Sequence, residues 1–188
     1  MTGAPRSQPP QGRSVDAYVA LGSNLGDRAA QLAAAIAALR AHPGVRVEAL
    51  STVYETAPVG PPPQGPYLNA VARLSTRLAP RALLERLLEI EVAAGRRRDG
   101  PRWSARTLDL DLLLYGSLVL DEPGLCIPHP RLHERAFVLE PLCELAPRLV
   151  HPRLGSRIEE LARRVRDPQA VVAFAFDPGA PAPEKTDP

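Results

Sequence analysis

The chain has 188 residues, and lysine is almost absent from it. Only Lys185, in the last few residues, is a lysine among 23 basic residues. The body of the chain therefore offers no Schiff-base amine, and an anion bound there must be held by arginine, backbone N–H groups or a metal ion. Aromatic residues make up only 4% of the chain, so few aromatic rings are available for the core or for stacking on a ligand.

Cysteine and long hydrophobic runs are also scarce. The two cysteines, Cys126 and Cys143, form neither a C-x-x-C pair nor a zinc-binding pattern, which is typical of a reduced, cytoplasmic protein. No stretch of 18 apolar residues occurs, and the first residues lack a hydrophobic signal region. The formal net charge of +2 is too small to indicate a nucleic-acid or membrane partner. We expect a cytoplasmic monomer.

Pro, Gly and polar residues dominate both ends of the chain, at residues 1–14 and 177–188. Neither end can bury enough apolar surface to offset its ordering entropy, so two flexible tails are predicted. The body, residues 15–176, is long enough to build its own core and is expected to be one domain.

Alternating and helical hydrophobic patterns follow one another through that body. Strands are predicted at 15–24, 45–56, 67–76 and 106–116, and helices at 26–42 and 80–95, with a loop-rich segment after Gly116 and two short helices near 137–147 and 155–165. Asp27 is placed to cap the first helix and Pro80 to begin the second. The order β-α-β-β-α-β predicts an α+β, ferredoxin-like fold, in which helices pack on an antiparallel sheet in a single compact domain.

The strand "RTLDLDLLLYG" carries two aspartates among leucines. Residues i and i+2 of a strand point to the same side, so Asp109 and Asp111 are predicted to share a face with Leu113, while Leu112 and Leu114 point to the other. Two adjacent carboxylates raise each other's pKa, and a divalent cation removes that conflict. Magnesium in particular favours one or two carboxylates plus phosphate oxygens.

Arginines crowd the segment that leads into this strand. Five of them lie between residues 96 and 106 against a single acid, Asp99: these are Arg96, Arg97, Arg98, Arg102 and Arg106. Taken alone, the diacid motif is weak and also fits a solvated sheet edge whose acids pair with nearby arginines. Together, carboxylates that hold metal and guanidinium groups that hold phosphate oxygens favour a metal–polyphosphate site. No P-loop or protein-kinase motif is present.

Four stretches together resemble the 6-hydroxymethyl-7,8-dihydropterin pyrophosphokinase family over residues 15–150. They are "YVALGSNLGDR", "YETAPVG…PYLNAV", "EIEVAAGRRR…RW…RTLDLDLLLYG" and "IPHPRLHERAFVLEPL". The resemblance implies transfer of the β,γ-diphosphate of ATP to the hydroxymethyl group of the pterin, with release of AMP, in folate biosynthesis. It also implies a ferredoxin-like fold and two magnesium ions bound with ATP. The substrates would be ATP and 6-hydroxymethyl-7,8-dihydropterin.

The resemblance also assigns roles to single residues. Asp109 and Asp111 would ligate both magnesium ions, and Arg96 and Arg106 would contact the phosphates during transfer. Further ATP contacts would come from Glu91, Arg98, Trp103, His129 and Arg135. The pterin would stack between Tyr67 and Phe137, bond to Asn69, and meet backbone groups of Thr56 and Val59. Without the resemblance, Glu91 would be interpreted as a solvated helix charge and His129 as a turn residue, while Tyr67 and Phe137 fit a core. The Gly22-Ser23-Asn24 signature is interpreted as a turn without chemistry of its own.

Some positions depart from the family pattern. Leu88 replaces a glutamine, Asp99 a lysine, Gly124 an arginine and Pro130 a tyrosine that some members carry. These departures bear on ATP affinity. Two other classes stay open: a two-magnesium nucleotidyltransferase, distinguished by release of pyrophosphate, and an RNA-binding domain, which the diacid strand disfavours because it repels phosphates.

Overall fold

The computed structural model describes residues 13–58, 64–96, 106–165 and 171–179. Its main sheet is antiparallel in every pairing and has the strand order β5-β1-β4-β3-β8, with β2 also pairing with β4. The strands are β1 (Val15–Ser23), β2 (Val45–Leu50), β3 (Val53–Thr56), β4 (Tyr67–Thr76), β5 (Asp109–Tyr115) and β8 (Val171–Phe174). Mixed α/β architecture around an antiparallel sheet is thus confirmed.

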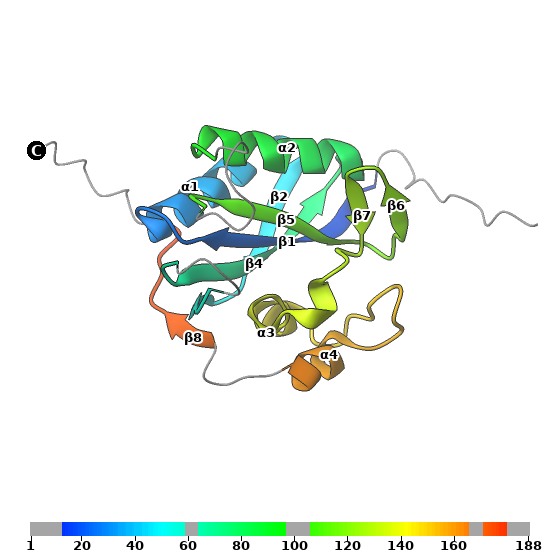
Figure 1. Ribbon diagram of the computed structural model, residues 1–188. Coiled ribbons are helices and arrows are strands. Elements are labelled where there is room, and N and C mark those ends of the chain that lie inside the picture. The colour runs from blue at the N-terminus through cyan, green and yellow to red at the C-terminus, as the bar shows by residue number, and fades with distance from the viewer. Residues whose placement is uncertain (1–12, 59–63, 97–105, 166–170, 180–188) are drawn as a thin grey trace, which may run out of the picture.

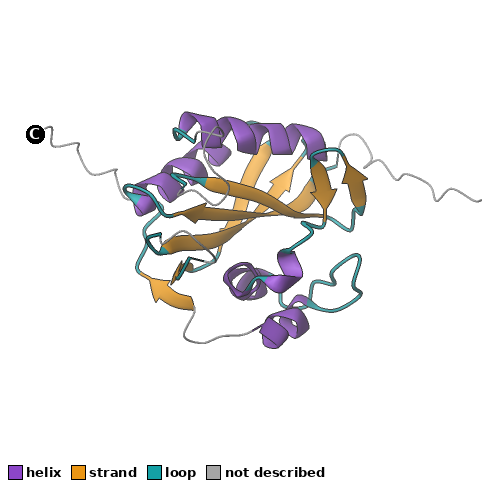
Figure 2. Ribbon diagram, in the orientation of Figure 1, coloured by secondary structure: helices purple, strands orange, loops and turns teal. Residues whose placement is uncertain are grey.

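Helices cover both faces of this sheet (Figures 1 and 2). On one face lie α1 (Arg28–Arg40) and α2 (Pro80–Ala93), and on the other α3 (Ala136–Leu145) and α4 (Ile158–Val165). Each face has its own core: Leu32 and Leu83 pack with the first helix pair, whereas Leu139 and Leu161 pack with the second. The molecule is therefore three layers deep, and the pocket described below lies between the sheet and α3.

Local signals set the helix starts as predicted. The Asp27 side chain accepts a hydrogen bond from the backbone N–H of Ala30, 2.9 Å away, at the beginning of α1. Pro80 is the first residue of α2, where its missing N–H costs nothing. The two short C-terminal helices are confirmed as α3 and α4.

The predicted strand 45–56 is divided into β2 and β3, which pair with β4 one after the other. The break falls at Ser51, whose hydroxyl accepts from the Val71 N–H and donates to the Thr52 carbonyl. A side chain that replaces backbone ladder bonds in this way is a local interaction that alternation of hydrophobicity does not reveal.

Three further features were not expected. The segment after Gly116 contains a small hairpin, β6 (Leu120–Glu122) and β7 (Leu125–Ile127), and a single 3-10 turn, η1 (Leu132–Glu134), precedes α3. The third is β8, which pairs with β3 at the edge of the main sheet.

A β-bulge corrects the predicted facing of Leu114. Pairing between β1 and β5 shifts between Tyr18 and Val19, so that Tyr18 faces Leu114 but Val19 faces Leu112. Leu113 is the extra residue, and beyond it the alternation is inverted. Leu114 therefore joins Leu113 in the α3 core instead of lying with Leu112 beneath α2.

Candidate active site

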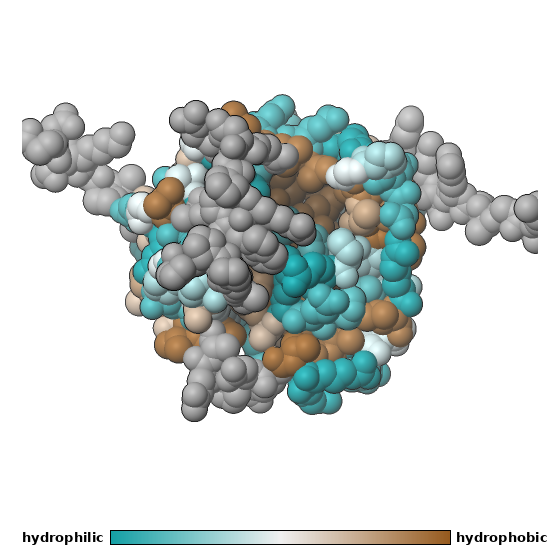
Figure 3. Space-filling model, viewed as in Figure 1, coloured by the Kyte–Doolittle hydropathy of each residue, from teal (hydrophilic) through white to brown (hydrophobic). Residues whose placement is uncertain are grey.

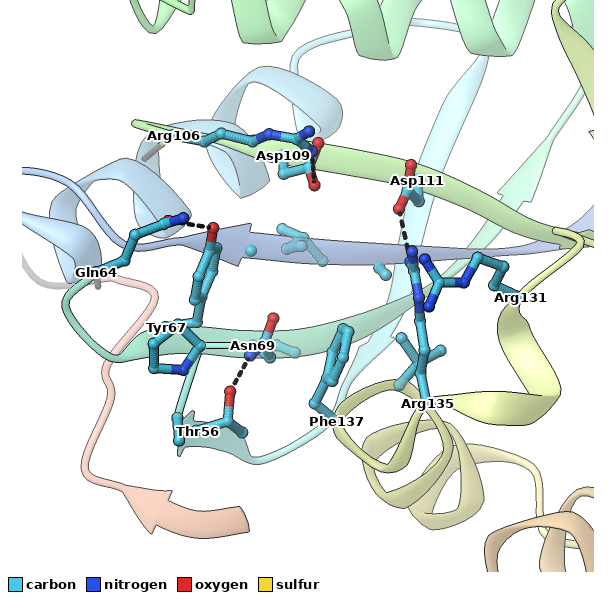
Figure 4. A pocket seen from close by; sticks show the side chains of 17 residues that line it. Thr56, Gln64, Tyr67, Asn69, Arg106, Asp109, Asp111, Arg131, Arg135 and Phe137 are labelled. Carbon is cyan, nitrogen blue, oxygen red and sulfur yellow. Dashed lines mark hydrogen bonds and ion pairs between the residues drawn. The ribbon is translucent and has the colours of Figure 1, made fainter. Parts of the chain in front are cut away.

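A cavity of about 340 Å³ opens between the sheet and the N-terminal end of α3. It is lined by β1, β4, β5, the end of β3 and the start of α3, a size and composition suited to a small-molecule ligand. Figure 4 shows acidic and basic side chains on one side of it, and aromatic and amide side chains on the other. On the face seen in Figure 3, hydrophobic residues lie in a hollow and hydrophilic residues gather below it.

Asp109 is held between two arginines. Its Oδ1 accepts from Arg96 Nη1 and its Oδ2 from Arg106 Nη1, each at 2.6 Å. The carboxylate is only 22% exposed, so each charge is partly desolvated and depends on its partners. Arg96, just after the end of α2, and Arg106, on the approach to β5, thus meet at the first residue of the diacid pair.

Asp111 is two residues further along β5 and faces the same pocket. Arg135 Nη1 lies 3.6 Å and His129 Nε2 3.9 Å from its Oδ2. Burial away from water raises the pKa of Asp111, and the neighbouring Asp109 carboxylate raises it further. Burial in turn lowers the pKa of His129. Both aspartates thus face the same cavity, as predicted, and their carboxylates repel each other.

Glu91 is not the solvated helix charge that its sequence position suggested. Its side chain is 1% exposed, and Oε1 accepts a 2.7 Å hydrogen bond from the backbone N–H of Leu110, between the two aspartates. Arg96 forms an ion pair with the same carboxylate. Glu91 therefore ties α2 to the diacid strand, and its contact with ATP stays a prediction.

The predicted pterin residues surround the other half of the cavity. Tyr67 and Phe137 stand on either side of Asn69, and the Asn69 Nδ2 donates a 2.7 Å hydrogen bond to Thr56 Oγ1 (Figure 4). Thr56 and Asn69 are both buried. The Tyr67 hydroxyl contacts Gln64 Oε1 at 3.1 Å, and burial raises the pKa of Tyr67.

Phe137 also contacts a residue of the charged half. The Arg135 guanidinium carbon lies 5.6 Å from the centroid of the Phe137 ring, within the range of a cation–π interaction. The same Arg135 faces Asp111, and it lines the cavity together with Phe137. Arg135 is the N-cap residue of α3 and Phe137 lies two residues later in its first turn, so this short segment links the acidic and aromatic walls of the cavity. Val59, Arg98 and Trp103 lie outside the described residues.

Sequence reasoning missed Asn24, which was assigned to a turn without chemistry. Its Oδ1 accepts from the Arg106 backbone N–H at 2.7 Å, and its Nδ2 donates to Gln64 Oε1 at 2.8 Å. One buried amide thus joins the charged and aromatic halves. Arg131, which lines the cavity, was also missed. The Gly-Ser-Asn signature and the arginine two residues after His129 were the available signals.

Magnesium fits the acidic half as a shared protein–substrate site. Two carboxylates on one strand face supply hard oxygen ligands, and phosphate oxygens or water complete the coordination that this ion favours. No group of three or more His, Cys, Asp or Glu side chains able to hold a metal by themselves occurs among the residues that the structure describes. The raised pKa of Asp111 next to Asp109 is the conflict that a bound cation would relieve.

Comparison with known proteins gives one consistent family. Residues 18–147 match the model of 7,8-dihydro-6-hydroxymethylpterin-pyrophosphokinase. A 2-amino-4-hydroxy-6-hydroxymethyldihydropteridine pyrophosphokinase of Pseudomonas aeruginosa is 49% identical over 144 residues, covering 77% of this chain and 88% of the relative. The enzyme of the same name from Bacillus subtilis is 42% identical over 149 residues, covering 79% and 89%.

Solved structures show the same fold. A Plasmodium falciparum HPPK-DHPS triple mutant superposes with a TM-score of 0.65 at 13% identity, covering 81% of this chain and 43% of that chain. This chain therefore spans less than half the length of that solved chain.

In the described part of the chain, no helix combines the length and apolar character needed to cross a membrane.

Proposed function

We propose how the residues of this chain carry out its reaction. The chain belongs to the 7,8-dihydro-6-hydroxymethylpterin-pyrophosphokinase family. It is a pyrophosphokinase of folate biosynthesis that acts on a hydroxymethyldihydropterin. The donor is ATP and the acceptor is 6-hydroxymethyl-7,8-dihydropterin. The acceptor hydroxyl oxygen forms a bond to the β-phosphorus and loses its proton. The bond from that phosphorus to the oxygen bridging the α-phosphate breaks, and AMP leaves with this oxygen.

The acidic half of the cavity would hold the triphosphate. Asp109 and Asp111 would be the ligands for two magnesium ions, which would supply neutralisation of phosphate charge and alignment of the reacting groups. Arg96 and Arg106, now paired with Asp109, are within reach of the same space and supply guanidinium groups to the phosphate oxygens. His129 and Arg135 face Asp111 and would contact ATP from the opposite side.

The aromatic half would hold the pterin. This flat heterocycle stacks between Tyr67 and Phe137, and its polar edge bonds to Asn69, which Thr56 fixes in orientation. The observation that carries the proposal is that one cavity joins these two halves across the sheet, with Asn69 on β4 and Asp109 on β5. That arrangement places acceptor and donor next to each other, which is most of what phosphoryl transfer requires.

We also infer that β1, α1, β2 with β3, β4, α2 and β5 form a ferredoxin-like unit. The support is the order β5-β1-β4-β3 with all neighbours antiparallel. In the same way we keep as proposals a monomeric state and a cytoplasmic location; sedimentation of the purified protein tests the first.

Phosphorus NMR of the protein with ATP, magnesium and 6-hydroxymethyl-7,8-dihydropterin tests the reaction. AMP and a pterin diphosphate are the expected products, whereas free pyrophosphate with an adenylylated acceptor would indicate a nucleotidyltransferase. Asp111→Asn is expected to lower turnover by about 100-fold or more because one metal ligand loses its charge. Asp121→Asn, at a carboxylate 74% exposed on the β6–β7 hairpin, is the matched control and should be silent.

A further inference from the structure

Gly22 lies in the middle of the site rather than in a turn at its border. It belongs to β1 and lines the cavity. In the sheet register it is directly opposite Asn69 of β4 on one side and Asp109 of β5 on the other. Figure 4 shows β1 passing between these two labelled side chains. Gly22 therefore lies between the Asn69 amide and the Asp109 carboxylate.

The backbone does not explain why this position is glycine. Five described glycines have positive φ angles, but Gly22 is not among them, so its conformation is open to any residue. A glycine inside a strand weakens it, and often marks a place where a ligand or another chain segment comes close. The side chains of β1 on this face also shrink toward the site, from Tyr18 to Ala20 to Gly22.

Space explains it instead. A Cβ at Gly22 would lie 3.2 Å from Asn69 Oδ1 and 3.8 Å from Asp109 Cβ. The Asn69 amide cannot move away without loss, because its Nδ2 donates the 2.7 Å hydrogen bond to Thr56. Even one methyl group would therefore displace the amide and cover the part of the cavity surface that the Gly22 backbone forms.

We propose that Gly22 is a positioning residue for the acceptor. Because it has no side chain, the Asn69 amide keeps its position, and the floor of the cavity, which is the β1 backbone at Gly22, stays open between Asn69 and Asp109. The hydroxymethyl group would reach the phosphates across this floor. This inference rests on the proposed function. An acceptor bonded to Asn69 and a phosphate held at Asp109 meet above Gly22, and a methyl group there would lift the acceptor away from the sheet. Donor binding depends on the carboxylates of Asp109 and Asp111, and a Cβ at Gly22 would displace neither: its distance to Asp109 Cβ would be 3.8 Å, an ordinary van der Waals contact.

Gly22→Ala tests this through binding as well as turnover. Pterin affinity is measured by fluorescence titration in the presence of magnesium and a non-hydrolysable ATP analogue, and analogue affinity is measured separately. We expect the pterin Kd to rise about tenfold, the worth of a displaced hydrogen-bonding group, while the analogue Kd stays within about twofold. An unchanged pterin Kd, or an equal rise in both Kd values, would overturn the inference.

Gly44→Ala is the matched control. There too a Cβ would lie 3.2 Å from a neighbour, Leu78 Cδ2, at a glycine without positive φ, but far from the cavity lining. Its Kd values should equal those of the wild type even if its unfolding midpoint changes. A pterin Kd raised here as in Gly22→Ala would assign the effect to general strain and contradict the inference.

A second pair of variants applies if Gly22→Ala does not fold. Asn69→Ser removes the oxygen that the new methyl group would meet, so the double variant Gly22→Ala/Asn69→Ser can accommodate it. The double variant should show kcat/KM for the pterin about threefold or more below that of Asn69→Ser alone, since the methyl group still covers the floor. Equal values would overturn the inference. Absence of pterin diphosphate with the wild-type protein would instead contradict the proposed function.

Discussion

At the scale of single residues, the carboxylates in and beside the pocket are paired with arginines. Asp109 pairs with Arg96 and Arg106, and the buried Glu91 shares Arg96 with it. Charges this poorly solvated are costly when one partner is removed, because the remaining charge stays buried without compensation. The same pairs keep the guanidinium groups next to the place where we propose that phosphate binds.

Glu91→Gln should destabilise the protein by about 1–3 kcal/mol. The amide oxygen can still accept from the Leu110 N–H, but the charge opposite Arg96 is lost. Urea unfolding measures the change. Glu89→Gln on the same helix removes a carboxylate that is 66% exposed and should change stability by no more than about 0.5 kcal/mol. Equal effects of the two substitutions would contradict a structural role for Glu91.

A buried histidine is expected to make stability depend on pH. Burial, aided by the nearby His133, lowers the pKa of His151, whose Nδ1 accepts from the backbone N–H groups of Arg153 and Leu154. Below the ordinary pKa of about 6.5, the unfolded chain binds the proton more readily than the folded one. Stability is therefore full above about pH 7 and falls as the pH decreases.

The variant His151→Asn isolates this contribution, since His129 also has a lowered pKa and adds to the slope of the wild type. Asparagine keeps an oxygen acceptor but cannot titrate. Urea unfolding between pH 7.5 and 5.5 should show a smaller loss in the variant, by up to about 1.4 kcal/mol per pH unit. Parallel slopes in the two proteins would show that His151 does not carry the pH dependence.

At the scale of elements, the sheet places the two halves of the pocket on neighbouring strands. Antiparallel register puts Asn69, Gly22 and Asp109 in one row across β4, β1 and β5. The bulge between β1 and β5 comes after this row, so it inverts the facing of Leu114 without disturbing the aspartates. The positions of Asn69 and Asp109 are therefore fixed by strand pairing rather than by loop conformation.

The cap of α1 should contribute to stability but not to activity. Asp27→Ala removes the acceptor for the Ala30 N–H and is expected to cost about 1 kcal/mol. Thermal or urea unfolding measures the loss, and kcat/KM is expected to stay at the wild-type value because Asp27 does not line the cavity. Asp27→Ser, which can still cap, should recover most of the stability. A serine variant as unstable as the alanine variant would rule out capping as the cause.

At the scale of the whole molecule, one sheet carries two cores and one pocket. The α1–α2 core and the α3–α4 core share the strands β1, β4 and β5. Ligand binding between the sheet and α3 therefore connects one core layer to the shared sheet. A ligand that binds only the folded state stabilises it in proportion to the logarithm of its concentration.

Magnesium with a non-hydrolysable ATP analogue should stabilise the protein as a unit. At an analogue concentration of about 100 times its Kd, the gain is expected to be about 2.7 kcal/mol, measured by urea unfolding. Removal of the metal with EDTA should abolish most of it, since the two carboxylates would then face phosphate without a cation. The same gain with and without EDTA would contradict the magnesium site at Asp109 and Asp111.

The sequence by itself determined the local features of this protein. The cap at Asp27, the helix start at Pro80 and the common facing of Asp109 and Asp111 all follow from neighbours a few residues apart, through backbone geometry and side-chain period. The family resemblance, confirmed by comparison, supplied the reaction, whereas the roles it assigns to single residues stay predictions.

Only the tertiary structure decided what depends on partners distant in the chain. Burial of Glu91 results from Leu110 and Arg96 on other segments, and the role of Asn24 from its bonds to Gln64 and Arg106. The register shift beside Leu113 and the addition of β8 likewise arise between strands rather than within one. Hydrophobic periodicity reports on which side of an element is apolar, but not on which polar groups from elsewhere will meet it, and these meetings determine the shape of the pocket.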